Sequence, residues 1–184
     1  MIKFDNETLF FSQFNLWDGI SIQTFLCSNL FLAVSETPEC PDGYQLFGEA
    51  CYKAFDEAKN YSSAEAFCAT DGGIVAEPRN RAVNNFLITL KTSLNPYVRF
   101  WLGLTDRKKE GTWRWNADGE KLDGNSFTNW AEGEPNQAGN EDCAVVEVNS
   151  KWNDVPCRLK YRFICERPAY GKKCVTGMNH ASYS

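Results

Sequence analysis

The chain has 184 residues, which is enough for one domain with short extensions and for a substantial hydrophobic core. Aromatic residues make up 14% of the sequence, including six Trp, and this excludes a disordered chain. The formal net charge is −5 and no block of Lys or Arg occurs, so the sequence offers no electrostatic surface for nucleic acid.

Residues 1–35 are predicted to be a signal peptide or leader. Residues 25–34 are mostly apolar but too few to span a bilayer, and Ala33-Val34-Ser35 has the small-x-small pattern of a cleavage site. The flank is unusual because Lys3 is its only basic residue. An uncleaved amphipathic leader, or an extension of the gene model, is therefore the rival interpretation.

The eight cysteines include no Cys-x-x-Cys pair and His180 is the only histidine, so the spacings of zinc ribbons and zinc fingers are absent. Disulfides are the better prediction, which indicates an oxidising compartment and a secreted, extracellular protein with no membrane span. If the leader is cleaved, Cys27 leaves with it, and Cys174 is free to link two chains into a disulfide-bonded homo-oligomer. If both cysteines stay, they can pair with each other.

After the leader, residues 44–55 read as a hairpin of short strands. Ser62 and Glu65 have the spacing of a capping box, which predicts a helix that begins at Ser62 and ends at Asp71-Gly72-Gly73. Asn60-Tyr61-Ser62 is also an acceptor triplet for N-glycosylation, and the sequence leaves open which use prevails. A second helix is predicted from about Asn80 to the residue before Asn95-Pro96, with apolar residues at helical spacing.

The second half reads as short strands and long loops. The strand candidates are rich in aromatic and β-branched residues and span residues 100–104, 112–115, 143–148 and 162–166. Residues 116–142 have almost no periodicity, and so long an irregular segment within a domain is usually functional or disordered. Trp130 favours an ordered, functional loop, and residues 167–184 read as a polar tail.

Carboxylate and amide oxygens are concentrated in residues 134–143 and again in residues 151–154. Calcium takes roughly 6–8 oxygen ligands from carboxylates, amides and backbone carbonyls, and a loop can bring them together where a strand would alternate them. The predicted primary calcium site consists of Glu134, Asn136, Glu141, Asn153 and Asp154. Each of these residues alone is equally typical of turns, so the prediction depends on their number.

The chain resembles the C-type lectin-like family from Cys40 to about Glu166. The resemblance lies in Trp101-Leu102-Gly103-Leu104, in Trp152-Asn153-Asp154 and in the order of four cysteines. It implies an α+β C-type lectin fold with two helices, two small antiparallel sheets and long calcium-binding loops, over a domain of residues 36–166. It also implies three disulfides, namely Cys68–Cys165, Cys143–Cys157 and, as in the family's long form, Cys40–Cys51.

The resemblance also implies a function, which is calcium-dependent carbohydrate binding. In similar family members two neighbouring sugar hydroxyls complete the shell of the ion, and Glu134, Asn136, Glu141 and Asn153 hydrogen-bond those hydroxyls. The Glu134-Pro135-Asn136 order, with a cis proline implied by the family, is similar to that of mannose, N-acetylglucosamine or fucose binders, whereas Gln-Pro-Asp members prefer galactose. A second calcium is expected at Asp106, Glu110 and Asp142 with Glu141 shared, although Gln137 departs from the usual Asp or Asn there, and the alternative is a set of solvated loop charges.

Two other functions compete with carbohydrate binding as interpretations of the sequence. An enzyme is not expected, because His180 in the tail provides no Ser-His or Cys-His nucleophile system, and the neighbouring acids Glu141 and Asp142 do not guarantee the spacing that glycoside hydrolysis needs. The stronger alternative is the same fold binding a protein ligand or an ice surface, as some relatives do. Those relatives often lose calcium ligands, whereas the five primary-site residues are present here.

Overall fold

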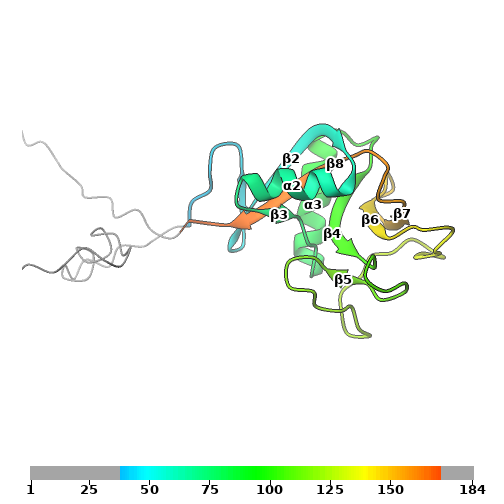
Figure 1. Ribbon diagram of the computed structural model, residues 1–184. Helices are drawn as coiled ribbons and strands as arrows, with labels where there is room; N and C mark the ends of the chain where they lie inside the picture. Colours follow the sequence, from blue (N-terminus) through cyan, green and yellow to red (C-terminus); the bar gives the residue numbers. More distant parts are fainter. Residues whose placement is uncertain (1–37, 171–184) are drawn as a thin grey trace, which may run out of the picture. The chain divides into compact units, whose positions relative to one another are not determined.

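The computed structural model describes residues 38–170, so the predicted leader, Cys27 and Cys174 lie outside the described residues. Figure 1 shows two helices beside a twisted sheet, as the sequence predicts. In chain order the elements are β1 (Gln45–Phe47), β2 (Ala50–Lys59), α2 (Tyr61–Thr70), β3 (Ile74–Val75), α3 (Arg81–Leu94), β4 (Phe100–Thr105), β5 (Arg114–Trp115), β6 (Cys143–Val146), β7 (Trp152–Val155) and β8 (Tyr161–Pro168).

The strands form one mixed sheet in the order β1-β2-β8-β4-β6-β7, with β3 paired to β8 and β5 paired to β4. The two small antiparallel sheets expected from the sequence are therefore joined, because β4 and β8 pair in parallel at Phe100↔Arg162 and Trp101↔Phe163. Phe100 and Trp101 are fully buried, and a buried backbone needs hydrogen-bond partners on both sides. The parallel pairing supplies them on the side of β4 that faces β8.

The first helix begins earlier than the capping box predicted. Asn60, not Ser62, is the N-cap of α2, and its Oδ1 accepts a hydrogen bond from the Ser63 backbone N–H at 2.9 Å. Tyr61 is fully buried and fixes the first turn, while Glu65 bonds to Arg107 and Asn116 instead of turning back to the cap. Asn60 and Ser62 can both cap a helix, and the burial of Tyr61 makes Asn60 the cap.

The second helix confirms its prediction at both ends. Asn80 caps the start of α3 by accepting from the Val83 backbone N–H at 2.9 Å, and Asn95 is the C-cap before Pro96. Leu87 and Leu90 are buried by α3 against the sheet. This face matches the apolar positions at helical spacing in the sequence.

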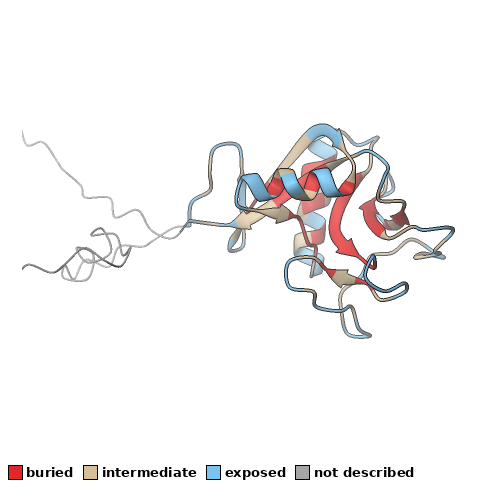
Figure 2. Ribbon diagram, viewed as in Figure 1, coloured by how far each residue is buried: buried red, intermediate tan, exposed pale blue. Residues whose placement is uncertain are grey.

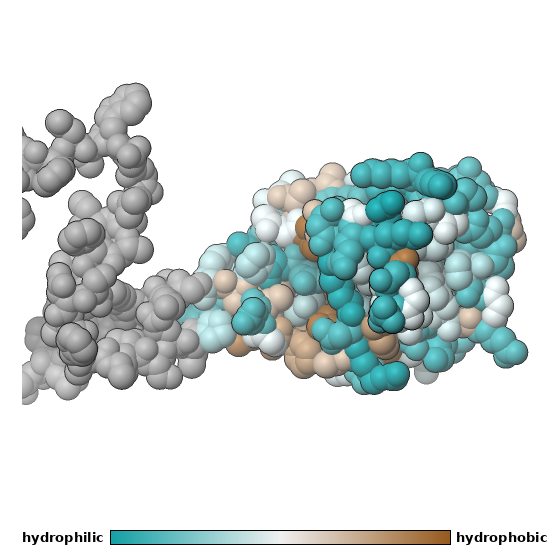
Figure 3. Space-filling view, turned by 90° about the horizontal axis from the view of Figure 1, so that it is seen from below, coloured by the Kyte–Doolittle hydropathy of each residue, from teal (hydrophilic) through white to brown (hydrophobic). Residues whose placement is uncertain are grey.

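The core contains the largest side chains of the domain, and Figure 2 shows the buried residues along β4, β6 and the inner faces of the helices. Trp101 and Trp152 are both fully buried, and Trp152 donates from its indole nitrogen to Asn84 Oδ1 at 2.9 Å. The face drawn in Figure 3 is mostly hydrophilic.

The three disulfides implied by the family resemblance are present, at Cys40–Cys51, Cys68–Cys165 and Cys143–Cys157.

The long irregular segment of residues 116–142 is packed onto the core by Trp130. Its ring lies 4.9 Å from Trp113 and 5.6 Å from Trp152, centroid to centroid, in edge-to-face arrangements. Trp130 and Trp152 also form an isolated β-bridge. The aromatic contacts anchor the segment whose next residues carry the predicted calcium ligands.

The two ends of the described chain meet beside the hairpin of β1 and β2. Glu39 and Tyr170 exchange backbone hydrogen bonds at 3.3 and 2.8 Å, and β8 continues through Pro168. The domain boundary placed at Glu166 from the sequence therefore falls inside β8.

Candidate metal centre

Glu134 and Asn136 face each other across a cis peptide bond between Glu134 and Pro135. Asn136 Nδ2 donates to Glu134 Oε1 at 3.0 Å, and the Asn136 backbone N–H donates to Glu134 Oε2 at 3.0 Å. The two side chains that flank the proline are thus held together as a carboxylate and an amide. This arrangement gives two different oxygen donors at one point of the loop.

Asp154 ties this loop to β7. Its side chain is fully buried, and its two oxygens accept from the backbone N–H groups of Asn136 at 3.2 Å and Gln137 at 2.9 Å. Gln137 has a φ of 58°, in the left-handed region, where the chain turns over the carboxylate. A buried residue on β7, the strand at one edge of the sheet, therefore fixes the loop that carries Glu134 and Asn136.

Glu141 joins the same group through a shared donor. The Ala138 backbone N–H donates to Asn136 Oδ1 at 2.8 Å and to Glu141 Oε2 at 3.1 Å. Four of the five predicted primary ligands are consequently connected by hydrogen bonds within one loop and to one strand. These four are Glu134, Asn136, Glu141 and Asp154.

Asn153, the fifth predicted ligand, lies beside Asp154 on β7. The expectation that all ligands lie on loops is therefore wrong for these two residues, which belong to a strand because Asn153 pairs with Val145 and Asp154 with Ala144. The Oδ1 atom of Asn153 is buried and accepts no hydrogen bond from the described part of the chain. A buried carbonyl oxygen without a partner is costly, and coordination of a cation would satisfy it.

The second predicted cluster is also assembled. One carboxylate oxygen each from Asp106, Glu110 and Asp142 lie within 4.8 Å of one another. Asp106 is buried, and its Oδ1 has no hydrogen-bond partner among the described residues, while its Oδ2 accepts from Gly111 N at 2.8 Å. Three acids that converge around such an atom fit a hard divalent cation.

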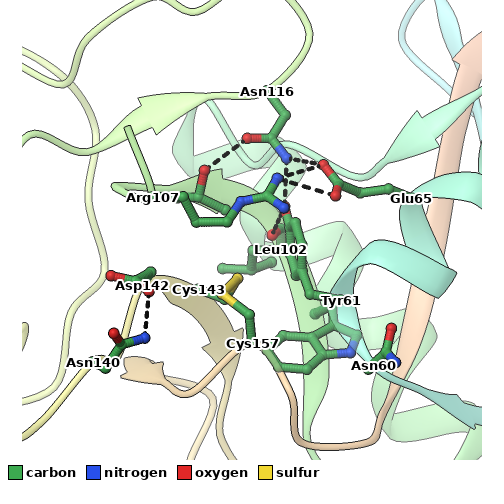
Figure 4. Close-up of a disulfide and its surroundings, with 12 residues drawn as sticks. Asn60, Tyr61, Glu65, Leu102, Arg107, Asn116, Asn140, Asp142, Cys143 and Cys157 are labelled. Atoms are coloured by element: carbon green, nitrogen blue, oxygen red, sulfur yellow. Dashed lines mark hydrogen bonds and ion pairs between the residues drawn. A yellow bond between two sulfur atoms is a disulfide. The ribbon is translucent and has the colours of Figure 1, made fainter. Parts of the chain in front are cut away.

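Two amides surround the second cluster. Gln137 donates from Nε2 to Asp106 Oδ2 at 3.0 Å, so its amide nitrogen, not its carbonyl, faces that carboxylate. Asn140 donates to Asp142 Oδ2 at 2.7 Å, close to the Cys143–Cys157 disulfide (Figure 4). The longer arm of Gln137 thus reaches the cluster, but as a donor in this structure.

Within residues 38–170, no side-chain cation forms an ion pair with the acids of either cluster. Burial raises the pKa of Glu134, and the neighbouring Asp154 carboxylate raises it further. Desolvation, followed by the nearby Asp106 and Asp142 carboxylates, raises the pKa of Glu110. None of the ion pairs among residues 38–170 includes an acid of either cluster, so like charges face one another. A divalent cation is the neutralising group that this donor set fits.

One residue of the site was missed from the sequence. Glu147 Oε1 accepts a hydrogen bond from Asn153 Nδ2 at 3.2 Å. The only signal for it in the sequence is an acid within the otherwise apolar strand candidate of residues 143–148.

The comparisons with known proteins agree with this architecture. Residues 57–167 match the family model described as the lectin C-type domain, and the chain belongs to this family, whose members are generally non-enzymatic binding proteins. The chain is 34% identical over 130 residues to a perlucin-like protein of Mytilus galloprovincialis, covering 68% of this chain and 81% of that protein. It is 52% identical over 126 residues to the hepatic lectin of Gallus gallus, covering 68% of this chain but 58% of that protein.

Solved structures of the same fold include both a carbohydrate-recognition domain and an antifreeze protein. The carbohydrate-recognition domain of cow CD23, solved in the presence of GlcNAc2Man3 oligosaccharide, has a TM-score of 0.64 at 30% identity, over 73% of this chain and 99% of that chain. A calcium-independent type II antifreeze protein has a TM-score of 0.63 at 26% identity, over 73% of this chain and 98% of that chain. Among the helices of residues 38–170, none is long and apolar enough to cross a membrane.

Proposed function

We propose that the domain is a calcium-dependent lectin whose primary site is formed by Glu134, Asn136, Glu141, Asn153 and Asp154. When bound, Ca²⁺ would offer open coordination positions to two neighbouring hydroxyls of a saccharide. The observation that carries the proposal is the buried Oδ1 of Asn153, which has no hydrogen-bond partner among residues 38–170 and adjoins acids that form no ion pair with those residues.

The side chains of the site would also orient the sugar. A carboxylate such as Glu134 can give one oxygen to the ion and accept a hydroxyl proton with the other, whereas Asn136 ligates through its carbonyl and donates through its amide nitrogen. Each sugar hydroxyl then meets a cation, an acceptor and a donor. This arrangement requires acids and amides in alternation, as in the Glu134-Pro135-Asn136 sequence.

The sugar class that we propose is mannose, N-acetylglucosamine or fucose. The order of acid and amide around Pro135 sets the direction of the hydrogen bonds, and exchanging the two would favour the galactose type. In support, a family structure with the same fold was obtained in the presence of an oligosaccharide that contains mannose and N-acetylglucosamine.

Affinity chromatography tests this proposal. We expect the protein to bind mannose-agarose in calcium and to elute with EDTA. The double substitution Glu134→Gln with Asn136→Asp should move retention from mannose to galactose, whereas Glu132→Gln, a nearby exposed acid, should leave it unchanged. Passage of the wild-type protein through the mannose column in calcium would contradict the proposal.

The alternative function is binding of a protein ligand or an ice surface without sugar recognition. It is favoured by the similarity to a calcium-independent antifreeze protein. Partner capture or inhibition of ice growth that persists in EDTA would support this alternative. The two proposals differ in whether the acids around Asn153 take part in binding.

We also propose a second calcium at Asp106, Glu110 and Asp142, with Glu141 shared. The three acids support it, as does Asp106 Oδ1, which has no hydrogen-bond partner in the part of the chain that the structure describes. A calorimetric stoichiometry of two ions per chain, falling to one in Asp106→Asn, would bear it out.

Secretion, with removal of residues 1–35 and a C-terminal tail that begins after β8, is a further proposal, and the three disulfides support export. A non-reducing gel tests whether Cys174 links two chains. Mass spectrometry of the exported protein tests the cleavage.

A further inference from the structure

We propose that Glu147 is a positioning residue, supported by Arg99, that orients the amide of Asn153 so that its oxygen faces the cation. This inference rests on the proposed function, because it concerns the same primary site. It assigns a role to two residues outside the predicted ligand set.

The orientation follows from hydrogen-bond chemistry. Glu147 Oε1 lies 3.2 Å from Asn153 Nδ2. An ionised carboxylate only accepts hydrogen bonds, so it must face the NH₂ group of the amide and not its carbonyl. The carbonyl oxygen then points away from Glu147, and this Oδ1 is buried with no hydrogen-bond partner among the described residues. One contact therefore determines which end of Asn153 is available to an ion.

Arg99 fixes the acceptor in turn. Its Nε donates to Glu147 Oε2 at 2.8 Å, so the two oxygens of Glu147 serve two different donors. The Arg99 guanidinium also donates to the Tyr161 hydroxyl at 2.9 Å and lies 5.5 Å from the centroid of that ring. The Glu147 side chain is only 15% exposed, so its ion pair with Arg99 is partly shielded from water.

The backbone around Glu147 limits its movement as well. Its N–H donates to the Lys151 carbonyl at 2.7 Å, and its carbonyl accepts from Ser150 N at 3.0 Å, closing the turn between β6 and β7. Glu147 is thus placed by the same hairpin that carries Asn153. Tyr161, Arg99, Glu147 and Asn153 form a continuous chain of hydrogen bonds from the start of β8 to the primary site.

This chain matters because an asparagine amide has two orientations of similar shape. If the acceptor is removed, rotation of Asn153 would present NH₂ to the cation, and a donor group cannot ligate calcium. Groups that orient a metal ligand typically change metal affinity by roughly 10–100-fold when they are mutated. We expect an effect of this size from Glu147.

The test compares Glu147→Ala with Glu57→Ala, which removes an exposed acid that pairs with Lys59. Calcium affinity is measured by calorimetry, and thermal stability is measured in EDTA. We expect Glu147→Ala to weaken binding to the primary site by about tenfold or more with little change of stability in EDTA, and Glu57→Ala to change neither. Glu147→Gln, which keeps one acceptor, should recover part of the affinity.

Equal calcium affinity in Glu147→Ala and the wild type would overturn the positioning role while leaving the proposed function intact. Absence of calcium binding by the wild type would overturn both. Should Glu147→Ala unfold, NMR of the wild-type protein in EDTA decides instead. We expect slow exchange of an Asn153 side-chain amide hydrogen, and fast exchange of both hydrogens would contradict the inference.

Discussion

The aromatic core and the acidic loop of residues 134–142 are held in opposite ways. In the core, Trp101 and Trp152 are fully buried, and Cys68–Cys165 links α2 to β8 covalently. In the loop, backbone N–H groups bond to the Asp154 carboxylate, and no ion pair within the described residues neutralises its acids. We infer that the core sets the stability of the fold, whereas the loop depends on a cation for its final geometry.

Removing the Cys68–Cys165 disulfide is the strongest test of the core. The bond closes a loop with a sequence separation of 97 residues. By the loop-entropy relation the double substitution to Ala should lower the free energy of unfolding by about 4–5 kcal/mol. Denaturant unfolding in EDTA and in calcium measures it. If the variant lost stability in calcium but not in EDTA, the inference that the core alone sets the stability of the fold would be wrong.

Substitution of a ligand in the loop should lower calcium affinity without lowering stability in EDTA. Glu134→Gln is expected to lower calcium affinity by about a hundredfold, at least as much as changes around a metal ligand do. Its stability in EDTA should be unchanged or slightly higher, because repulsion from Asp154 is relieved. Calorimetry and thermal unfolding measure the two effects. Glu132→Gln makes the same charge change on an exposed neighbour and should alter neither.

The start of α2 provides a smaller test on the core side. Asn60→Ala removes the side chain that accepts from Ser63 N and should cost about 1 kcal/mol of stability. Ser62→Ala should be close to neutral, because Ser62 is exposed inside the helix, where Ala is favoured. Urea unfolding compares the two variants. A larger loss of stability in Ser62→Ala than in Asn60→Ala would contradict this and indicate that Ser62 caps the helix.

The smallest effect concerns pH and the half-buried side chain of Glu166. Burial raises the pKa of Glu166 in the folded state above its unfolded value. A carboxyl with a raised folded pKa favours folding below its unfolded pKa, about 4.3, and this contribution is lost as pH rises through the folded pKa. Glu166→Gln should therefore gain stability relative to the wild type between pH 4 and pH 7. A constant difference across this range would contradict the raised pKa.

The elements that the sequence predicted well have strong local signals. The helix at Asn80 has a cap, an apolar face and a proline beyond its end, and the structure confirms all three. The cap of α2 was misplaced because Asn60 and Ser62 can both cap, and only the burial of Tyr61 decides between them. The joining of the sheet was missed because the pairing of β4 with β8 is between residues far apart in sequence.

In the candidate site, the sequence predicted the identity of the oxygen donors better than it predicted the elements on which they lie. Glu134, Asn136 and Glu141 were recognisable as oxygen donors in an irregular segment, and the structure connects them. That Asn153 lies on β7 was not predicted, because Trp152-Asn153-Asp154 was interpreted as a loop. Glu147 was missed for a physical reason, since its role depends on a contact across the β6–β7 hairpin and not on its own chemistry.

Calorimetric titration of the wild-type domain with Ca²⁺ tests the central claim most directly. We expect saturable heat with tight binding, because a cation would neutralise the acids around Asp154 and satisfy the Asn153 oxygen that no described residue hydrogen-bonds. A titration without heat above dilution, on folded protein, would contradict it.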